Sequence, residues 1–143
     1  MSLAICPGSF DPITLGHLNI IRRASKIFDK VVVCIMVNST KMTPMFSVDE
    51  RVDMAKRVVE RLPNVEVDTF DGLLAEYAKK YDDAVIVKGM RAASDFEYEF
   101  QMNLINKKIN PDLETMFLTA SEKYTFLSSS VVREMASYGA ELT

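Results

Sequence analysis

Apolar stretches alternate with helical patterns along the chain, and this alternation predicts the order of its elements. Residues 31–37 form an unbroken apolar run rich in valine, which is typical of a strand covered on both faces. Before that run, Leu18, Ile21 and Phe28 recur at the spacing of one helix face. With a short apolar strand expected at residues 3–6, the first unit is strand, helix, strand.

The same alternation continues toward the C-terminus. Residues 47–50 have the sequence of a capping box that begins a second helix, and Pro63 with Asn64 is expected to end it. Further strands are expected at residues 65–68, 84–87 and 115–118, and further helices at about 74–81, 95–109 and 128–138. Five strands alternating with helices predict an α/β fold with a Rossmann-like, doubly wound, five-stranded parallel sheet and right-handed crossovers.

Length and composition limit the class of protein. A chain of 143 residues with 48% hydrophobic residues fits a single domain spanning residues 1–143. A net charge of −3 without a basic run argues against a nucleic-acid or membrane surface. No apolar run is as long as a membrane span and no secretory pattern is present, so we expect a cytoplasmic protein. Cys6 and Cys34 lie within apolar strands and are expected to be buried, reduced thiols.

The candidate chemistry lies where predicted strands end, because ligands of open parallel sheets bind at the carboxyl edge. Residues 7–17 form a glycine-bearing turn from the first strand into the first helix. Thr14 is expected to be the N-cap of that helix, which places His17, the only histidine, in its first turn. The free amides and the dipole of a helix N-terminus both attract an anion. We therefore predict a phosphate site beside His17.

Other polar residues are expected at the same edge. Lys41, Lys88 and Arg91 supply positive charge, and the serines at 128–130 begin a helix whose amides can hold a phosphate. Each has an ordinary explanation as well, since lysines are commonly solvated, a lone histidine is usually a surface residue, and one serine suffices as an N-cap. Their convergence favours the anion site.

Motifs that the chain lacks argue against some classes of reaction. The chain has neither the Walker lysine loop nor the Gly-x-Gly-x-x-Gly fingerprint, which disfavours hydride transfer on a dinucleotide. Ser9 would need a second histidine to form an independent triad, and there is none. Phosphate chemistry by positioning and charge stabilisation fits these residues better than covalent catalysis.

Five segments support a more specific comparison: residues 8–12, 14–17, 88–91, 95–99 and 127–133. Together, and in this order, they closely resemble the phosphopantetheine adenylyltransferases of the nucleotidyltransferase superfamily. Threonine in place of the first histidine of the superfamily's His-x-Gly-His motif, as at Thr14, is the form seen in that family. The resemblance implies reversible transfer of AMP from ATP to 4′-phosphopantetheine in coenzyme A biosynthesis, giving dephospho-coenzyme A and pyrophosphate.

The resemblance also implies a role for each matching residue. His17 would contact the ATP phosphates and stabilise the transition state at the α-phosphorus, with Ser9 orienting the incoming phosphate and Lys41 as a third catalytic residue. The residues expected to bind ATP are Ser9, Phe10, His17, Gly89, Met90, Arg91, Glu99, Tyr124, Thr125, Phe126, Leu127, Ser128, Ser129 and Ser130. Those expected to bind phosphopantetheine are Ser9, Lys41, Leu74, Lys88, Met102 and Asn106.

Further expectations come only from the resemblance. Mg²⁺ would enter with ATP without a metal ligand from the chain, the assembly would be a homohexamer, and coenzyme A would be a feedback inhibitor. Lys88 stands where the family usually has arginine. A guanidinium that can bind two phosphate oxygens is therefore replaced by an ammonium, which is a compact point charge. Family chains usually continue past residue 143, so the C-terminal helix of the family is expected to be missing from this chain.

Two other functions remain as alternatives. A cytidylyltransferase acting on a small alcohol phosphate is disfavoured because that group keeps both histidines, whereas this chain has Thr14. A non-catalytic nucleotide sensor is disfavoured because His17 and the serine triplet are both present.

Overall fold

The structure is a computed structural model that describes residues 2–37, 45–81, 83–90 and 93–119. Its elements in chain order are β1 (Leu3–Gly8), α1 (Leu15–Ile27), β2 (Lys30–Met36), α2 (Val48–Val59), β3 (Val65–Phe70), α3 (Leu74–Ala78), β4 (Ala84–Met90), α4 (Ala93–Ile109) and β5 (Glu114–Thr119). All pairings are parallel, in the order β3-β2-β1-β4-β5. The predicted doubly wound, five-stranded parallel sheet is confirmed.

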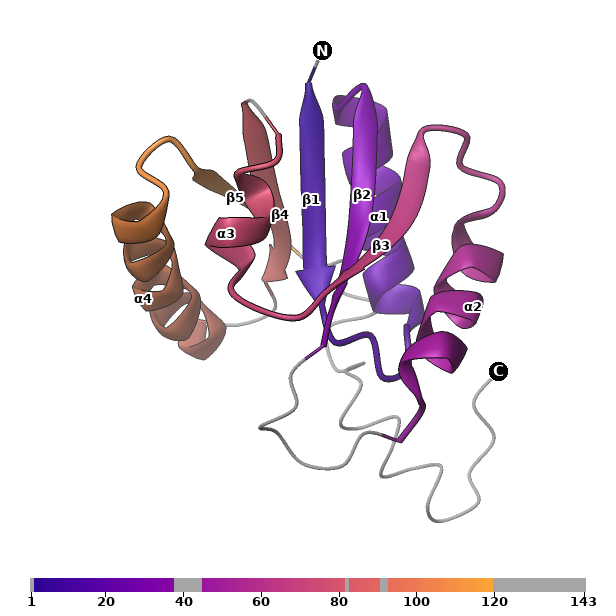
Figure 1. The fold of residues 1–143 in the computed structure, drawn as a ribbon. Helices are drawn as coiled ribbons and strands as arrows, with labels where there is room; N and C mark the ends of the chain where they lie inside the picture. The colour runs from indigo at the N-terminus through magenta and orange to yellow at the C-terminus, as the bar shows by residue number, and fades with distance from the viewer. Residues whose placement is uncertain (1, 38–44, 82, 91–92, 120–143) are drawn as a thin grey trace.

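The order of the strands makes the carboxyl end of β1 the point where the topology reverses. The chain moves outward from β1 to β2 and β3, and then returns to the other side of β1 for β4 and β5. In Figure 1 the strands run downward, so that their carboxyl ends meet at the lower edge of the sheet. Open α/β sheets bind ligands at this position.

Helices cover both faces of the sheet, as the unbroken apolar run of β2 predicts. One core joins Val31, Val33 and Ile35 of β2 to buried residues of α1 and α2. The other core joins Val32 and Cys34 to buried residues of α3. Figure 1 shows α3 in front of the sheet and α1 behind it. Because successive residues of a strand face opposite sides, both cores need apolar residues from the same short run.

Cys6 and Cys34 are free and buried, as expected from their apolar neighbours. Burial raises the pKa of each thiol to about 12, because the charged thiolate is disfavoured away from water. Among the described residues, no helix is long and apolar enough to cross a membrane.

The fourth strand extends further than the sequence pattern predicts. The sequence pattern ends the fourth strand at residue 87, but β4 continues through Met90 because its backbone pairs with β5, where Met90 lies opposite Thr119. Gly89 permits a close contact there, since a Cβ at this position would lie 2.9 Å from the side chain of Ile20. The fourth helix begins at Ala93, two residues before the predicted start at 95. The last predicted helix, at residues 128–138, lies outside the described residues.

A polar cluster fastens the short helix α3 to β3. The Tyr77 hydroxyl donates to Oδ2 of Asp68 at 2.7 Å, and the amide of Thr69 donates to Oδ1 at 2.8 Å. Nζ of Lys80 lies 3.4 Å from the same carboxylate and 4.7 Å from the centre of the Tyr77 ring. The hydrogen bond from Tyr77, helped by those from Thr69 and Lys80, lowers the pKa of Asp68. Burial and the bond to Asp68 raise the pKa of Tyr77.

The lowered pKa of Asp68 predicts a pH-dependent contribution to stability. A carboxyl whose pKa is lower in the folded state stabilises the fold above its unfolded pKa, and this stabilisation is lost as the pH falls through the folded value. We expect Asp68→Asn to reduce the free energy of unfolding at neutral pH by about 1 kcal/mol, since Asp68 is partly solvated. The difference from wild type should shrink as the pH falls below the ordinary carboxyl pKa of 3.8.

Urea unfolding of both proteins at several pH values measures this difference. Asp112→Asn, at an exposed position, is the matched control and should leave the free energy of unfolding close to that of wild type. A difference between Asp68→Asn and wild type that is the same at acidic and neutral pH would contradict the prediction.

Candidate functional site

The turn after β1 is built around the buried ring of Phe10. Phe10 has a positive φ of 48°, and its side chain is only 4% exposed. Its ring leaves little room at Gly8, where a Cβ would lie 3.2 Å from the ring. The ring also meets the imidazole of His17 edge-on, with centroids 4.9 Å apart. Phe10 therefore packs inside the turn and supports His17 from the protein side.

Thr14 and His17 cap the first helix reciprocally. The backbone amide of His17 donates to Oγ1 of Thr14 at 3.2 Å, and the backbone amide of Thr14 donates to Nδ1 of His17 at 2.9 Å. The predicted N-cap and the place of His17 in the first turn are thus confirmed. Sequence reasoning did not identify the second bond, because a capping box ordinarily has Glu or Gln at the position that His17 occupies.

This capping arrangement fixes the tautomer of the neutral imidazole. Because Nδ1 accepts a hydrogen bond from a backbone amide, the proton of the neutral ring lies on Nε2. His17 therefore presents Nε2–H as a hydrogen-bond donor at the positive end of α1. A neutral donor in this position can bind a phosphate oxygen without first gaining a proton.

Two predicted site residues on consecutive elements, β4 and α4, form an ion pair. Nζ of Lys88 lies 2.6 Å from Oε2 of Glu99, and each side chain is about one-fifth exposed. The resemblance assigned Lys88 to the acceptor phosphate and Glu99 to ATP, so this ion pair joins the two expected ligand sites. Gly89 and Met90 follow Lys88 in the last part of β4.

The residues expected around the pantetheine arm lie on α3 and α4, which pack together. Leu74 contacts the core on that side of the sheet, Met102 is half-buried, and Asn106 is buried. Sequence reasoning did not single out the neighbouring Asn103. Its Oδ1 atom is buried and has no hydrogen-bond partner within the described part of the chain, and the sequence contained no signal for this.

Several predicted site residues lie outside the described residues. They are Lys41, Arg91, Tyr124, Thr125, Phe126, Leu127, Ser128, Ser129 and Ser130. Ser9, Phe10, His17, Gly89, Met90, Lys88, Glu99, Leu74, Met102 and Asn106 lie within them.

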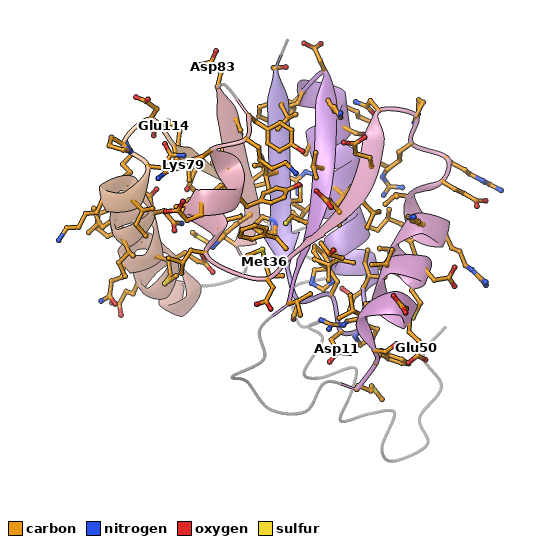
Figure 2. All side chains as sticks on the ribbon, viewed as in Figure 1. Asp11, Met36, Glu50, Lys79, Asp83 and Glu114 are labelled. Carbon is orange, nitrogen blue, oxygen red and sulfur yellow. The ribbon has the colours of Figure 1, made fainter. Side chains whose placement is uncertain are left out.

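Two buried charged residues join the turn after β1 to the beginning of α2, and neither was a predicted site residue. Asp11 accepts the backbone amides of Met45 and Phe46 at 2.8 and 2.9 Å. Arg51 donates from Nη1 to the carbonyl of Ser9 at 3.1 Å. Figure 2 shows Asp11 near Glu50 of α2, and Asp83 at the opposite edge of the sheet. A signal for Arg51 did exist, because it stands four residues before Ala55 on the apolar face of its helix.

A hollow of about 220 Å³ lies away from this site. Its lining includes Asp29, Lys30 and Pro63, at the amino ends of β2 and β3, and the Lys30–Glu66 ion pair of 3.0 Å lies beside it. Ligands of parallel sheets bind at the carboxyl ends instead, where His17 and Lys88 lie. The candidate site is therefore the edge formed by the ends of β1 and β4.

Comparisons with known proteins agree with this fold. A family model described as Cytidylyltransferase-like matches residues 5–135, which defines the class of protein. A crystal structure of a bifunctional NMN adenylyltransferase/ADP ribose pyrophosphatase from Francisella tularensis shares the fold, with a TM-score of 0.68 and 16% identity. The match covers 96% of this chain and 42% of the Francisella tularensis chain.

Sequence relatives define the family more closely. Phosphopantetheine adenylyltransferase of Caldanaerobacter subterraneus subsp. tengcongensis is 55% identical over 143 residues, covering 100% of this chain and 89% of the relative. Phosphopantetheine adenylyltransferase of Clostridium tetani is 55% identical over 139 residues, which cover 97% of this chain and 86% of that relative. The chain belongs to the phosphopantetheine adenylyltransferase family within the Cytidylyltransferase-like proteins.

Proposed function

We propose that this protein transfers AMP from ATP to 4′-phosphopantetheine, giving dephospho-coenzyme A and pyrophosphate. In this reaction a phosphate oxygen of the acceptor attacks the α-phosphorus of ATP, and the bond from that phosphorus to pyrophosphate breaks. The observation that carries the proposal is the His17 donor at the start of α1, held by Thr14 at the carboxyl end of β1. The named relatives at 55% identity support the same activity.

His17 would act by donating a hydrogen bond. Its Nδ1 atom is engaged by the backbone of Thr14, so Nε2–H is directed to the reacting phosphate and the ring does not need to move a proton. The amides at the start of α1 add positive potential where negative charge develops. Ser9, directly after β1, would orient the incoming phosphate.

Lys88 would hold the phosphate of the acceptor. It lies in the last part of β4, next to β1 in the sheet. Its ion pair with Glu99 keeps the ammonium directed toward α4, so an entering phosphate would replace or share the Glu99 carboxylate. Glu99 would then be available to the nucleotide. Gly89, Met90, Arg91 and the residues at 124–130 complete the proposed ATP site.

Mg²⁺ fits this site as an ion carried by ATP. Both oxygens of Asp11, the only carboxylate of the turn, accept backbone amides. In the part of the chain that the structure describes, no three or more His, Cys, Asp or Glu side chains group to hold a metal. Mg²⁺ commonly keeps several waters and is bound through substrate phosphates, and bound in this way it would neutralise negative charge on the ATP phosphates.

Assembly, regulation and location complete the proposal. Exposed apolar side chains on α4, at Phe100, Leu104 and Ile105, support a homo-oligomer, for which the resemblance implies a hexamer. The same resemblance supports feedback inhibition by coenzyme A, a product-like ligand of the same site, and a cytoplasmic location.

Incubating the purified protein with ATP, Mg²⁺ and 4′-phosphopantetheine tests the activity directly, with mass spectrometry as the readout. We expect dephospho-coenzyme A and pyrophosphate in equal amounts. Parallel reactions with CTP and small alcohol phosphates test the cytidylyltransferase alternative. Nucleotide binding without any product would favour the sensor instead.

The role of His17 predicts a large loss of turnover in His17→Ala. Removing one preorganised donor to a charged transition state costs about 2.7–4 kcal/mol, or about a hundred- to a thousandfold in kcat. Steady-state kinetics measure this loss. His17→Gln is the matched control for folding, because glutamine also completes a capping box. We expect it to keep the thermal stability of wild type and to lose activity as His17→Ala does. Turnover above about a third of wild type in His17→Ala would contradict the proposal.

The role of Lys88 predicts a selective effect on the acceptor. Lys88→Ala should weaken phosphopantetheine binding roughly tenfold or more, since about 1.4 kcal/mol is one decade of affinity. Lys88→Arg should be tolerated and should bind at least as tightly, because a guanidinium can contact two phosphate oxygens.

Calorimetry with phosphopantetheine measures these affinities. Lys107→Ala is the matched control, because it breaks a similar pair, 2.8 Å from Glu114, in the last turn of α4. If Lys88→Ala binds the acceptor as wild type does, Lys88 is not its ligand.

A further inference from the structure

Arg51 is a buried arginine at the beginning of α2. It is 5% exposed, although arginine is rarely buried unless it is paired. Within residues 2–37, 45–81, 83–90 and 93–119, no carboxylate forms a salt bridge with it. Burial of an arginine is costly, so the bonds that it does make need an explanation.

The two hydrogen bonds of Arg51 join two separate pieces of backbone. Nη1 donates to the carbonyl of Ser9 at 3.1 Å, and Nε donates to the carbonyl of Ser47 at 3.4 Å. Ser47 is the N-cap of α2, and its carbonyl also accepts the backbone amide of Arg51 at 2.9 Å. The planar guanidinium therefore holds the Ser9 carbonyl at a fixed distance from the first turn of α2.

Asp11 makes a second connection between the same two segments, with the opposite polarity. Its carboxylate, on the turn, accepts two amides just before α2, whereas the guanidinium of Arg51, on α2, donates to the turn. Together, the Asp11 and Arg51 contacts restrict the turn more than a single contact would. Each contact prevents the turn from rotating about the other. The turn is also the segment that carries Ser9 and leads to His17.

We propose that Arg51 is a positioning residue for adenylyl transfer, which acts by fixing the backbone of Ser9 so that the phosphate-binding turn meets the reacting phosphates in one geometry. This inference rests on the proposed function. In catalysis by positioning, a small displacement of the binding groups lowers turnover strongly. Arg51 would therefore affect kcat without touching either substrate.

The test compares Arg51→Met and Arg51→Lys with wild type at a temperature well below the melting transition. We expect Arg51→Met to lower kcat roughly tenfold or more, with the KM for phosphopantetheine within about twofold of wild type. The acceptor phosphate would still bind Lys88, in the neighbouring strand β4. Arg51→Lys keeps the charge and one donor group, so its kcat should lie between that of wild type and that of Arg51→Met.

Arg57→Met is the matched control. Arg57 lies on the same helix but is 77% exposed and pairs with Asp53, so its loss should change neither kcat nor KM. Thermal melts of all variants show whether the protein folds. If Arg51→Met does not fold, the kcat of the folded Arg51→Lys variant decides, with reduced turnover supporting the proposal.

Three results distinguish a failure of the role of Arg51 from a failure of the proposed function. Wild-type kcat in folded Arg51→Met, or in Arg51→Lys where only that variant folds, overturns the role of Arg51. A loss of activity that appears only as a raised KM for phosphopantetheine, with kcat unchanged, also overturns the role of Arg51. If wild type and Arg57→Met both form no dephospho-coenzyme A, the proposed function itself is wrong.

Discussion

The burial of β1 between two parallel strands is the constraint on which the rest of the structure depends. Its backbone is paired with β2 on one side and β4 on the other, and both of its faces are covered. A strand in this position can leave the sheet only at its carboxyl end, and parallel neighbours require crossovers. The turn of residues 9–14, and the helix that follows, therefore lie where the strand order reverses. The same burial accounts for the raised thiol pKa of Cys6 within the strand.

At His17 the first helix combines a capping role with the proposed chemical one. The Nδ1 atom of His17 replaces the carboxylate of an ordinary capping box, and its bond to Thr14 leaves the other ring nitrogen with the proton. An N-cap contributes about 1 kcal/mol to stability, less than the several kcal/mol that a preorganised donor can contribute to catalysis. The proposed chemistry at Nε2 would therefore involve more free energy than the contribution of His17 to the fold.

Electrostatics couple the two proposed ligand sites. The Lys88–Glu99 pair is largely shielded from water, and a charge-assisted hydrogen bond of this kind contributes about 1.5–3 kcal/mol. A phosphate that binds Lys88 must compete with the carboxylate, so part of its interaction energy is used to release Glu99. Because Lys88 lies on β4 and Glu99 on α4, this exchange connects the end of the sheet to the helix that packs beside α3.

The sequence by itself determined the order of the elements from β1 to β5, the parallel sheet, and the N-cap at Thr14 with His17 in the first turn. Periodicity and capping are local properties of the chain, which is why these predictions were confirmed. Only the tertiary structure decided that β4 extends through Met90, because that extension depends on pairing with β5. It also decided the contacts from Arg51 to Ser9, from Met45 to Asp11 and from Lys88 to Glu99. Those contacts join residues 42, 34 and 11 positions apart, and no local pattern specifies which distant groups the packed sheet will bring together.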